Sequence, residues 1–148
     1  MKEIEIRPFE AKDSSQVAAL DQERFQLSPY REKTFLDSLS LLRQKILLVS
    51  SAKEVLGYLF YGWVEDEAEI YRLAVKKKEE GKGYATALLE EGERLLKEEG
   101  VKTVYLEVRK SNFRAQKLYA KEGYVFYRER KAYYDNGEDA YCLKKGLE

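Results

Sequence analysis

Apolar residues recur along the chain with two different periods, and the shorter period predicts strands. Ile4 and Ile6 alternate with charged residues, which is typical of a half-buried strand, and Pro8 marks its end. Longer apolar runs predict three further strands, at residues 45–51, 55–64 and 68–75. The polar breaks between these three strands are short, so we expect hairpins and antiparallel neighbours.

The longer, helical period predicts two helices between the first strand and the second. Asp13 and Gln16 are spaced like a capping box at the start of the first helix, which continues to Phe25. The second helix is expected at residues 30–42. Its predicted apolar face consists of Phe35, Leu36, Leu39 and Leu42.

The second half of the chain alternates helices with strands. A helix is predicted between Gly83 and Gly100, and a shorter one at residues 112–122. The remaining strands are expected at residues 101–109, 124–134 and 138–143. The predicted order is therefore β α α β β β α β α β β, in which the third helix connects two parallel strands by a right-handed crossover.

This order predicts an α/β fold with a mixed sheet of the α+β type. We expect seven strands in one sheet, flanked by four helices. No linker, repeat or low-complexity tract divides the chain, so residues 1–148 are expected to form a single domain.

The composition excludes several kinds of chemistry. The 148 residues include no histidine, which rules out a His-based catalytic relay, and the single Cys142 cannot build a multi-cysteine zinc site. We therefore expect no metal and interpret Cys142 as a strand residue of the core. Lys+Arg and Asp+Glu both number 27, so no net charge favours nucleic acid as a partner. The chain has no early apolar run long enough for a signal peptide or a membrane span, and we expect a cytoplasmic monomer or weak dimer.

The segment from Lys78 to Ala85 is the one phosphate-binding pattern in the sequence. It leaves a predicted strand and opens a helix, where free backbone N–H groups and the helix dipole favour an anion. Gly81 and Gly83 carry no side chains that would keep a pyrophosphate away from those groups. The pattern is not a P-loop, because Gly83 stands where Ser or Thr would bind magnesium, and it fits a Rossmann fingerprint poorly. Backbone geometry alone could also require these glycines.

Two side chains could carry acid–base chemistry beside this helix. Glu107 lies near the carboxyl end of the strand that follows this helix, on the face opposite Val104, Leu106 and Val108. A carboxylate at such a strand end can take up a proton from a ligand. The alternative is a surface glutamate paired with Arg109 or Arg72. Tyr119 lies on the fourth helix; it could be an ordinary core tyrosine, or its phenol could donate a proton to a departing thiolate.

Five segments together resemble the GNAT superfamily of N-acetyltransferases, and within it the RimI-type ribosomal-protein-alanine N-alpha-acetyltransferases. They are residues 28–35, 73–75 with 81–85, 106–112, 118–119 and 133–140. This similarity extends over essentially the whole chain. It implies acetyl-CoA as the cosubstrate, a protein or peptide N-terminus as the acceptor, with a ribosomal protein as a candidate source, and a GNAT-like fold.

The resemblance also implies roles for individual residues. Glu107 would be the general base and Tyr119 the general acid. The residues implied to bind the cofactor are Leu73, Ala74, Val75, Lys78, Gly81, Lys82, Gly83, Tyr84, Ala85 and Asn112. Those implied to bind the acceptor are Tyr30, Tyr133 and Tyr134.

The sequence departs from the family pattern at the phosphate-binding loop and on the acceptor side. The loop after Val75 is shorter than usual, and Glu79 and Glu80 bring negative charge beside the expected pyrophosphate, which should weaken its binding. Tyr30 stands where the subfamily has Trp. Acetylation of lysine or of a small amine, and a non-catalytic acyl-CoA sensor, therefore remain alternatives.

Overall fold

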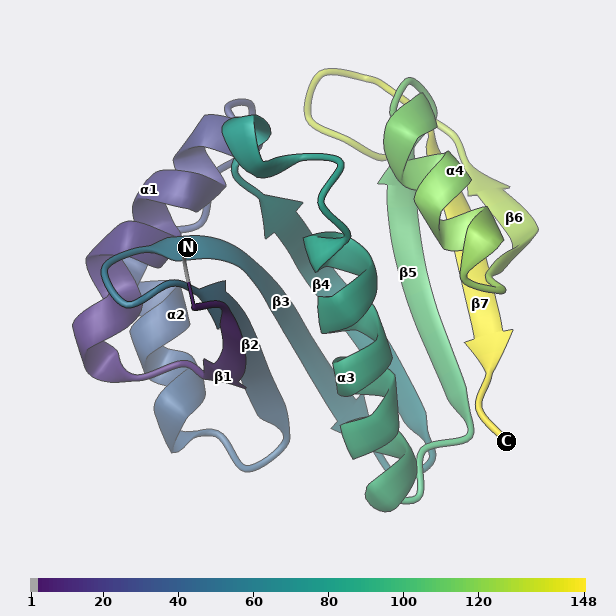
Figure 1. The fold of residues 1–148 in the computed structure, drawn as a ribbon. Coiled ribbons are helices and arrows are strands. Elements are labelled where there is room, and N and C mark those ends of the chain that lie inside the picture. Colours follow the sequence, from purple (N-terminus) through teal and green to yellow (C-terminus); the bar gives the residue numbers. More distant parts are fainter. Residues whose placement is uncertain (1–2) are drawn as a thin grey trace.

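The computed structural model describes residues 3–148, which form one mixed sheet of seven strands with the spatial order β1-β2-β3-β4-β5-β7-β6 (Figure 1). The strands are β1 (Glu5–Pro8), β2 (Gln44–Ser50), β3 (Val55–Val64), β4 (Glu67–Val75), β5 (Thr103–Arg109), β6 (Val125–Arg130) and β7 (Ala140–Gly146). All neighbours are antiparallel except β4 and β5, which are parallel. The predicted seven-stranded mixed sheet is thus confirmed.

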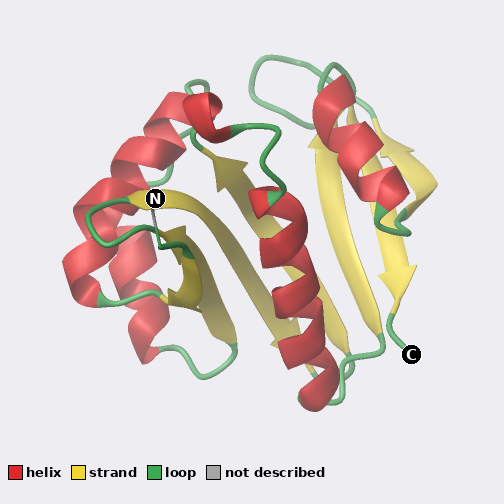
Figure 2. Cartoon of the chain, in the orientation of Figure 1, coloured by secondary structure: helices red, strands yellow, loops and turns green. Residues whose placement is uncertain are grey.

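Helices cover both faces of this sheet. Within residues 3–148 there are four α-helices: α1 (Ser14–Arg24), α2 (Glu32–Asp37), α3 (Tyr84–Glu98) and α4 (Phe113–Lys121). Figure 2 shows α3 and α4 in front of the sheet, where Leu88, Leu89 and Leu96 of α3 belong to one buried apolar cluster. Val17 and Leu20 of α1 and Phe35 of α2 belong to a second cluster on the opposite face. No helix in the described part of the chain is long and apolar enough to cross a bilayer.

The sheet divides where β4 and β5 separate. Their ladder holds only as far as the pair Glu69 and Tyr105, and beyond this pair the two strands diverge toward their carboxyl ends (Figure 1). Between residues 70 and 75, the backbone groups of β4 that face β5 therefore have no strand partner, and an extended ligand could bind there. We refer to the diverging ends of these two strands, which are residues 70–75 of β4 and 106–109 of β5, as the notch.

A β-bulge in β4 lies beside the notch. Phe60 of β3 pairs with Arg72 and the next residue, Tyr61, pairs with Ile70, so Tyr71 is the extra residue. As a result Tyr71 and Arg72 both point to the α1/α2 face, where Tyr71 packs against the second apolar cluster. A regular strand would place these neighbouring residues on opposite faces.

The predicted capping box at the start of the first helix is wrong. The carboxylate of Asp13 instead accepts two hydrogen bonds of 2.8 Å from the guanidinium of Arg7 on β1 and one of 2.9 Å from the backbone N–H of Glu10. The side chain of Gln16 accepts a hydrogen bond of 2.8 Å from the backbone N–H of Val55. Arg7, the backbone of Glu10 and the start of β3 thus replace the expected partners in the first turn of α1.

The second helix and the last two strands are shorter or shifted relative to the prediction. Helix α2 begins at Glu32, and a 3₁₀ turn (Ser38–Ser40) replaces its last predicted turn. Of the predicted apolar face only Phe35 is fully buried; the exposed members are Leu36, Leu39 and Leu42. The strand expected at residues 124–134 ends at Arg130, which leaves Tyr133 and Tyr134 in the loop before β7.

Candidate functional site

The phosphate-binding segment forms an open turn at the start of α3. Gly81 and Gly83 have φ values of +82° and +85°, and a Cβ atom added to either would meet nothing within 4 Å. Gly83 is the N-cap of α3, so the free N–H groups of the first turn face this open space. Both glycines are needed for their backbone conformation, and they also leave room for an anion.

Each acidic side chain of this loop has a basic partner. Glu79 is buried and lies 3.1 Å from the ammonium of Lys82. Glu80 lies 3.6 Å from Arg24 of α1 and 2.7 Å from Arg114 of α4. These pairs offset the negative charge that the sequence places beside the expected pyrophosphate.

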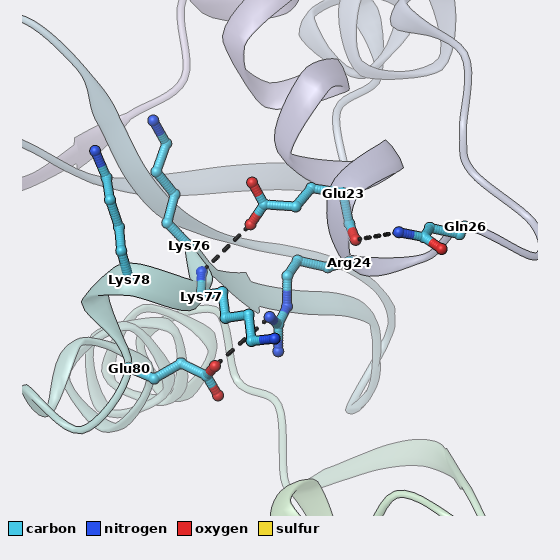
Figure 3. A pocket seen from close by; sticks show the side chains of 7 residues that line it. All are labelled: Glu23, Arg24, Gln26, Lys76, Lys77, Lys78 and Glu80. Atoms are coloured by element: carbon cyan, nitrogen blue, oxygen red, sulfur yellow. Dashed lines mark hydrogen bonds and ion pairs between the residues drawn. The ribbon is translucent and has the colours of Figure 1, made fainter.

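An open, mostly basic hollow lies between this loop and the end of α1. Figure 3 shows the side chains that line it, which are Glu23, Arg24, Gln26, Lys76, Lys77, Lys78 and Glu80. The backbone N–H of Lys77 donates a hydrogen bond of 3.3 Å to Glu23, which ties the loop to α1. Lys78 lies at the rim, 3.8 Å from Glu54.

Glu107 occupies the side of the notch formed by β5. Its carboxylate accepts a hydrogen bond of 3.0 Å from the hydroxyl of Tyr133 and lies 3.0 Å from Nε of Arg130. Neither partner considered from the sequence contacts it, because Arg109 pairs with Glu138 and Arg72 pairs with Asp21. The guanidinium of Arg130 reaches Glu107 across β7, which lies between β5 and β6 in the sheet. A hydrogen bond to Cys142 and the charge of Glu107 raise the pKa of Arg130.

Tyr119 is buried on α4, near Tyr134 of the loop before β7. Its ring is 7% exposed and packs edge-on against Tyr124 with 5.6 Å between centroids. Burial, and secondarily the nearby Tyr134 hydroxyl, raise the pKa of Tyr119, so this phenol is protonated at neutral pH. Burial and the charge of Glu107 likewise raise the pKa of Tyr134, to about 12. Tyr134 is therefore near enough to Glu107 to be affected by its charge, and near enough to Tyr119 to affect the pKa of that phenol.

The predicted acceptor residues flank the notch from two sides. The rings of Tyr133 and Tyr134 contact each other at 5.1 Å on the β7 side. Tyr30 lies on the other side, with its ring 6.1 Å from Phe60. Burial and the charge of Glu69 raise the pKa of Tyr71. The Tyr30 hydroxyl also contributes to this rise, which indicates that Tyr71 lies near Tyr30.

A buried ionic network holds the Tyr30 side in place. The carboxylate of Asp21 is fully buried and accepts hydrogen bonds from the Tyr58 hydroxyl, from Arg72 and, at 2.7 Å, from the backbone N–H of Tyr30. The guanidinium of Arg72 stacks on the Tyr30 ring, 3.9 Å from its centroid. It also donates a hydrogen bond of 2.7 Å to the carbonyl of Ser28.

Asn112 has a structural partner of its own. Its side chain caps α4 by accepting a hydrogen bond of 3.1 Å from the backbone N–H of Ala115. The other residues expected to bind the cofactor lie on two elements beside the notch. Residues 73–75 belong to the end of β4, and Tyr84 and Ala85 begin α3.

Glu69 and Arg130 both lie at this site, and neither is among the residues predicted from the sequence. Ala68 and Ile70 are core residues, so the alternation of β4 could have placed Glu69 on the face of Glu107. Arg130 had no such signal, because a bulge between Phe126 and Arg128 changes which face the end of β6 presents.

Comparison with known proteins assigns the chain to a family. The Acetyltransferase (GNAT) family matches residues 4–124. The chain belongs to this family. An uncharacterized N-acetyltransferase of Methanocaldococcus jannaschii is 33% identical over 144 residues, which cover 95% of this chain and 90% of that protein.

Relatives within the GNAT family include enzymes named for ribosomal-protein acetylation. The ribosomal protein bS18-alanine N-acetyltransferase of Escherichia coli K12 is 33% identical over 125 residues, covering 82% of this chain and 84% of that protein. The crystal structure of the ribosomal-protein-S18-alanine N-acetyltransferase from Escherichia coli superposes with a TM-score of 0.87 at 29% identity, covering 98% and 94% of the two chains. The resemblance to GNAT acetyltransferases of the RimI type is confirmed, and the protein is an acetyltransferase.

Proposed function

We propose that this GNAT protein transfers the acetyl group of acetyl-CoA to the α-amine of a protein or peptide N-terminus. The observation that carries the proposal is the hydrogen bond of 3.0 Å between Tyr133 and Glu107, which joins an aromatic loop to a carboxylate beside the notch. The names of the Escherichia coli relatives support an N-terminal alanine as acceptor, and a ribosomal protein as its source.

The residues at the start of α3 fit acetyl-CoA. The open space at Gly81 and Gly83 would let a pyrophosphate approach the N–H groups of the first turn, and Lys78 and Lys82 add positive charge nearby. Residues 73–75 would lie along the pantetheine arm, and Tyr84, Ala85 and Asn112 would border it. Bound acetyl-CoA would supply the acetyl group as a thioester, activated for transfer to an amine.

Three kinds of group in the chain would promote the transfer. Glu107 is the carboxylate toward which the acceptor amine would lose its proton. Unpaired backbone N–H groups of residues 70–75 would stabilise negative charge on the carbonyl oxygen as the amine attacks. Tyr119, which is protonated at neutral pH, would donate its proton to the departing sulfur.

The acceptor site favours a terminal amine over a lysine side chain. Tyr30 on one side and Tyr133 with Tyr134 on the other would line a slot in which the first residues of a peptide lie. A lysine would have to enter with polypeptide on both sides of it. An α-amine has a pKa of about 8 and a lysine amine one of about 10.4, so the α-amine needs less help from a carboxylate base at neutral pH.

Mass spectrometry of acetylated peptides tests the proposed acceptor. We expect peptides that begin with Ala or Ser to be acetylated at the α-amine much faster than the same peptides with a blocked N-terminus and an internal lysine. Acetylation chiefly on lysine, or only of a small polyamine, would contradict the N-terminal assignment. Binding of acetyl-CoA without transfer to any amine would instead support the non-catalytic sensor.

A further inference from the structure

A small cavity lies between the sheet and the C-terminal end of α3, at the other end of this helix from the proposed pyrophosphate site. Its volume is about 100 Å³, and its walls are Lys45 of β2, Tyr61 and Trp63 of β3, and the last turn of α3 with its C-cap, Glu99. Figure 1 shows this end of α3 at the end of the sheet away from the diverging strands β4 and β5. The cavity is therefore separate from the notch, and the acetyl transfer proposed above does not use it.

The hydroxyl of Tyr61 is a buried polar group that has no hydrogen-bond partner within residues 3–148. Tyr61 is 1% exposed, so it belongs to the inner wall of the cavity. Burial, and after it the charges of Glu91 and Glu99, raise the pKa of Tyr61, which indicates that the hydroxyl lies toward the C-terminal half of α3. Burying a hydroxyl without a partner costs free energy, and a polar ligand that bonds to it would recover that cost.

Charged groups of opposite sign stand on facing walls of the cavity. Lys45 is opposite Tyr61 in the ladder of β2 and β3, so its side chain is on the same face of the sheet. Lys45 and Glu99 are both exposed, and neither makes an ion pair or a side-chain hydrogen bond within the described part of the chain. Glu98 also lines the cavity but already pairs with Arg94. Because the dipole of α3 adds negative potential at its C-terminal end, the sheet wall is positive and the helix wall negative.

The remaining walls are apolar and limit the size of a ligand. The rings of Tyr61 and Trp63 lie side by side with 6.1 Å between centroids, and Leu95 faces them from α3. A cavity of about 150 Å³ holds benzene, so a volume of about 100 Å³ suits roughly five non-hydrogen atoms.

We propose that this cavity binds a small free amino acid, such as glycine, in its zwitterionic form. The carboxylate of the amino acid lies toward Lys45 and accepts a hydrogen bond from the Tyr61 hydroxyl, and its ammonium group lies toward Glu99. A simple amine would leave Lys45 without a partner, and a simple carboxylate would leave Glu99 without one. A zwitterion uses both walls, and the site does not depend on which acceptor the protein acetylates.

Three probes of nearly equal size test the charge preference. Glycine carries both charges, glycinamide only the positive one and glycolate only the negative one, and all three have the same number of non-hydrogen atoms. Trp63 is the one tryptophan of the chain, so its fluorescence reports directly on this cavity. In titrations without acetyl-CoA at constant ionic strength, followed by fluorescence and by calorimetry, we expect glycine to bind with a Kd on the order of 1 mM. Glycinamide and glycolate should each bind at least about tenfold more weakly.

Variants at the cavity assign each contact. Lys45→Met should raise the Kd for glycine about tenfold and leave that for glycinamide unchanged, whereas Glu99→Gln should do the same for glycine and leave glycolate unchanged. Tyr61→Phe should raise the Kd for glycine about two- to tenfold, as expected for the loss of one hydrogen bond. Lys97→Met removes an exposed lysine at the same end of α3 that does not line the cavity, and its Kd should stay within about twofold.

Three results would overturn the proposal. Glycinamide or glycolate binding as tightly as glycine would show that the site does not select a zwitterion. Glycine binding that is unaffected by both Lys45→Met and Glu99→Gln would place the amino acid elsewhere, for example in the acceptor slot. The absence of saturable glycine binding by both fluorescence and calorimetry would show that the cavity takes no such ligand. None of these results bears on the proposed acetyl transfer.

Discussion

Asp21 and Arg72 form an ion pair, with 3.0 Å between Oδ2 and Nη1, in which the side chains are 0% and 10% exposed. The pair joins α1 to β4 at the bulge beside the notch. Because Asp21 also bonds the backbone of Tyr30, it fixes the start of α2 as well as the sheet. The acceptor side of the site thus depends on a buried charge pair that holds Tyr30 in place.

Removing one partner of this pair should strongly destabilise the protein. We expect Arg72→Met to lower the free energy of unfolding by about 3–5 kcal/mol, because Asp21 would be left buried without its cation. Urea denaturation measures this loss. Arg94→Met, which removes an exposed pair with Glu91 at 2.7 Å, is the control and should leave stability nearly unchanged. Equal losses in the two variants would show that the buried pair has no special role.

Replacement of Gly83 should weaken acetyl-CoA binding specifically. Gly83 and Gly100 have φ values of +85° and +88°, and neither has an atom within 4 Å of an added Cβ, so Gly83→Ala and Gly100→Ala introduce similar backbone strain at opposite ends of α3. Only Gly83→Ala adds a methyl group at the proposed pyrophosphate site. Calorimetry should show the Kd for acetyl-CoA raised roughly tenfold or more by Gly83→Ala and unchanged by Gly100→Ala. A similar Kd in both folded variants would place the pyrophosphate elsewhere.

The hydroxyl of Tyr119 should affect turnover more than stability. We expect Tyr119→Phe to lower kcat and to leave the affinity for acetyl-CoA nearly unchanged. We expect Glu107→Gln to lower the acetylation rate about 10²- to 10⁴-fold at neutral pH, also with nearly unchanged affinity for acetyl-CoA. Tyr124→Phe is the matched control, since its hydroxyl donates a hydrogen bond of 2.8 Å to Glu93 in the same aromatic pair. Stopped-flow measurement of the chemical step decides the matter; normal rates for both Tyr119→Phe and Glu107→Gln would return these residues to structural roles.

Much of the sheet was predictable because its strands carry strong local patterns. The strand predicted at residues 55–64 is the observed β3, and the alternation around Glu107 placed it on the face that borders the notch. The glycines at 81 and 83 were also informative, because the left-handed backbone of a turn into a helix strongly favours glycine.

The remaining features depend on partners that lie on other elements of the fold. Asp13 looks like a helix cap, but Arg7 on β1 binds its carboxylate. The sequence offered Arg109 and Arg72 as partners for Glu107. The cation that contacts it is Arg130, which the sheet order brings to it across β7. Neither outcome follows from local periodicity, because a bulge or a strand insertion changes which side chains meet.

The bulge at Tyr71 also determines how β4 could change in length over evolution. Because Tyr71 is the extra residue of the ladder, loss of its single codon would leave the inward and outward order of all other β4 residues as it is. Loss of the Arg72 codon would keep that order too, because Tyr71 and Arg72 point to the same face, but it would leave the buried Asp21 without its cation. Loss of any other codon in the interior of the strand would reverse the order on one side of the deletion, exposing core residues or burying Glu69. The loop after Val75 lies outside the ladder, so its shortening carries no such penalty, and insertions and deletions in this lineage are expected to be confined to position 71 and to the loops.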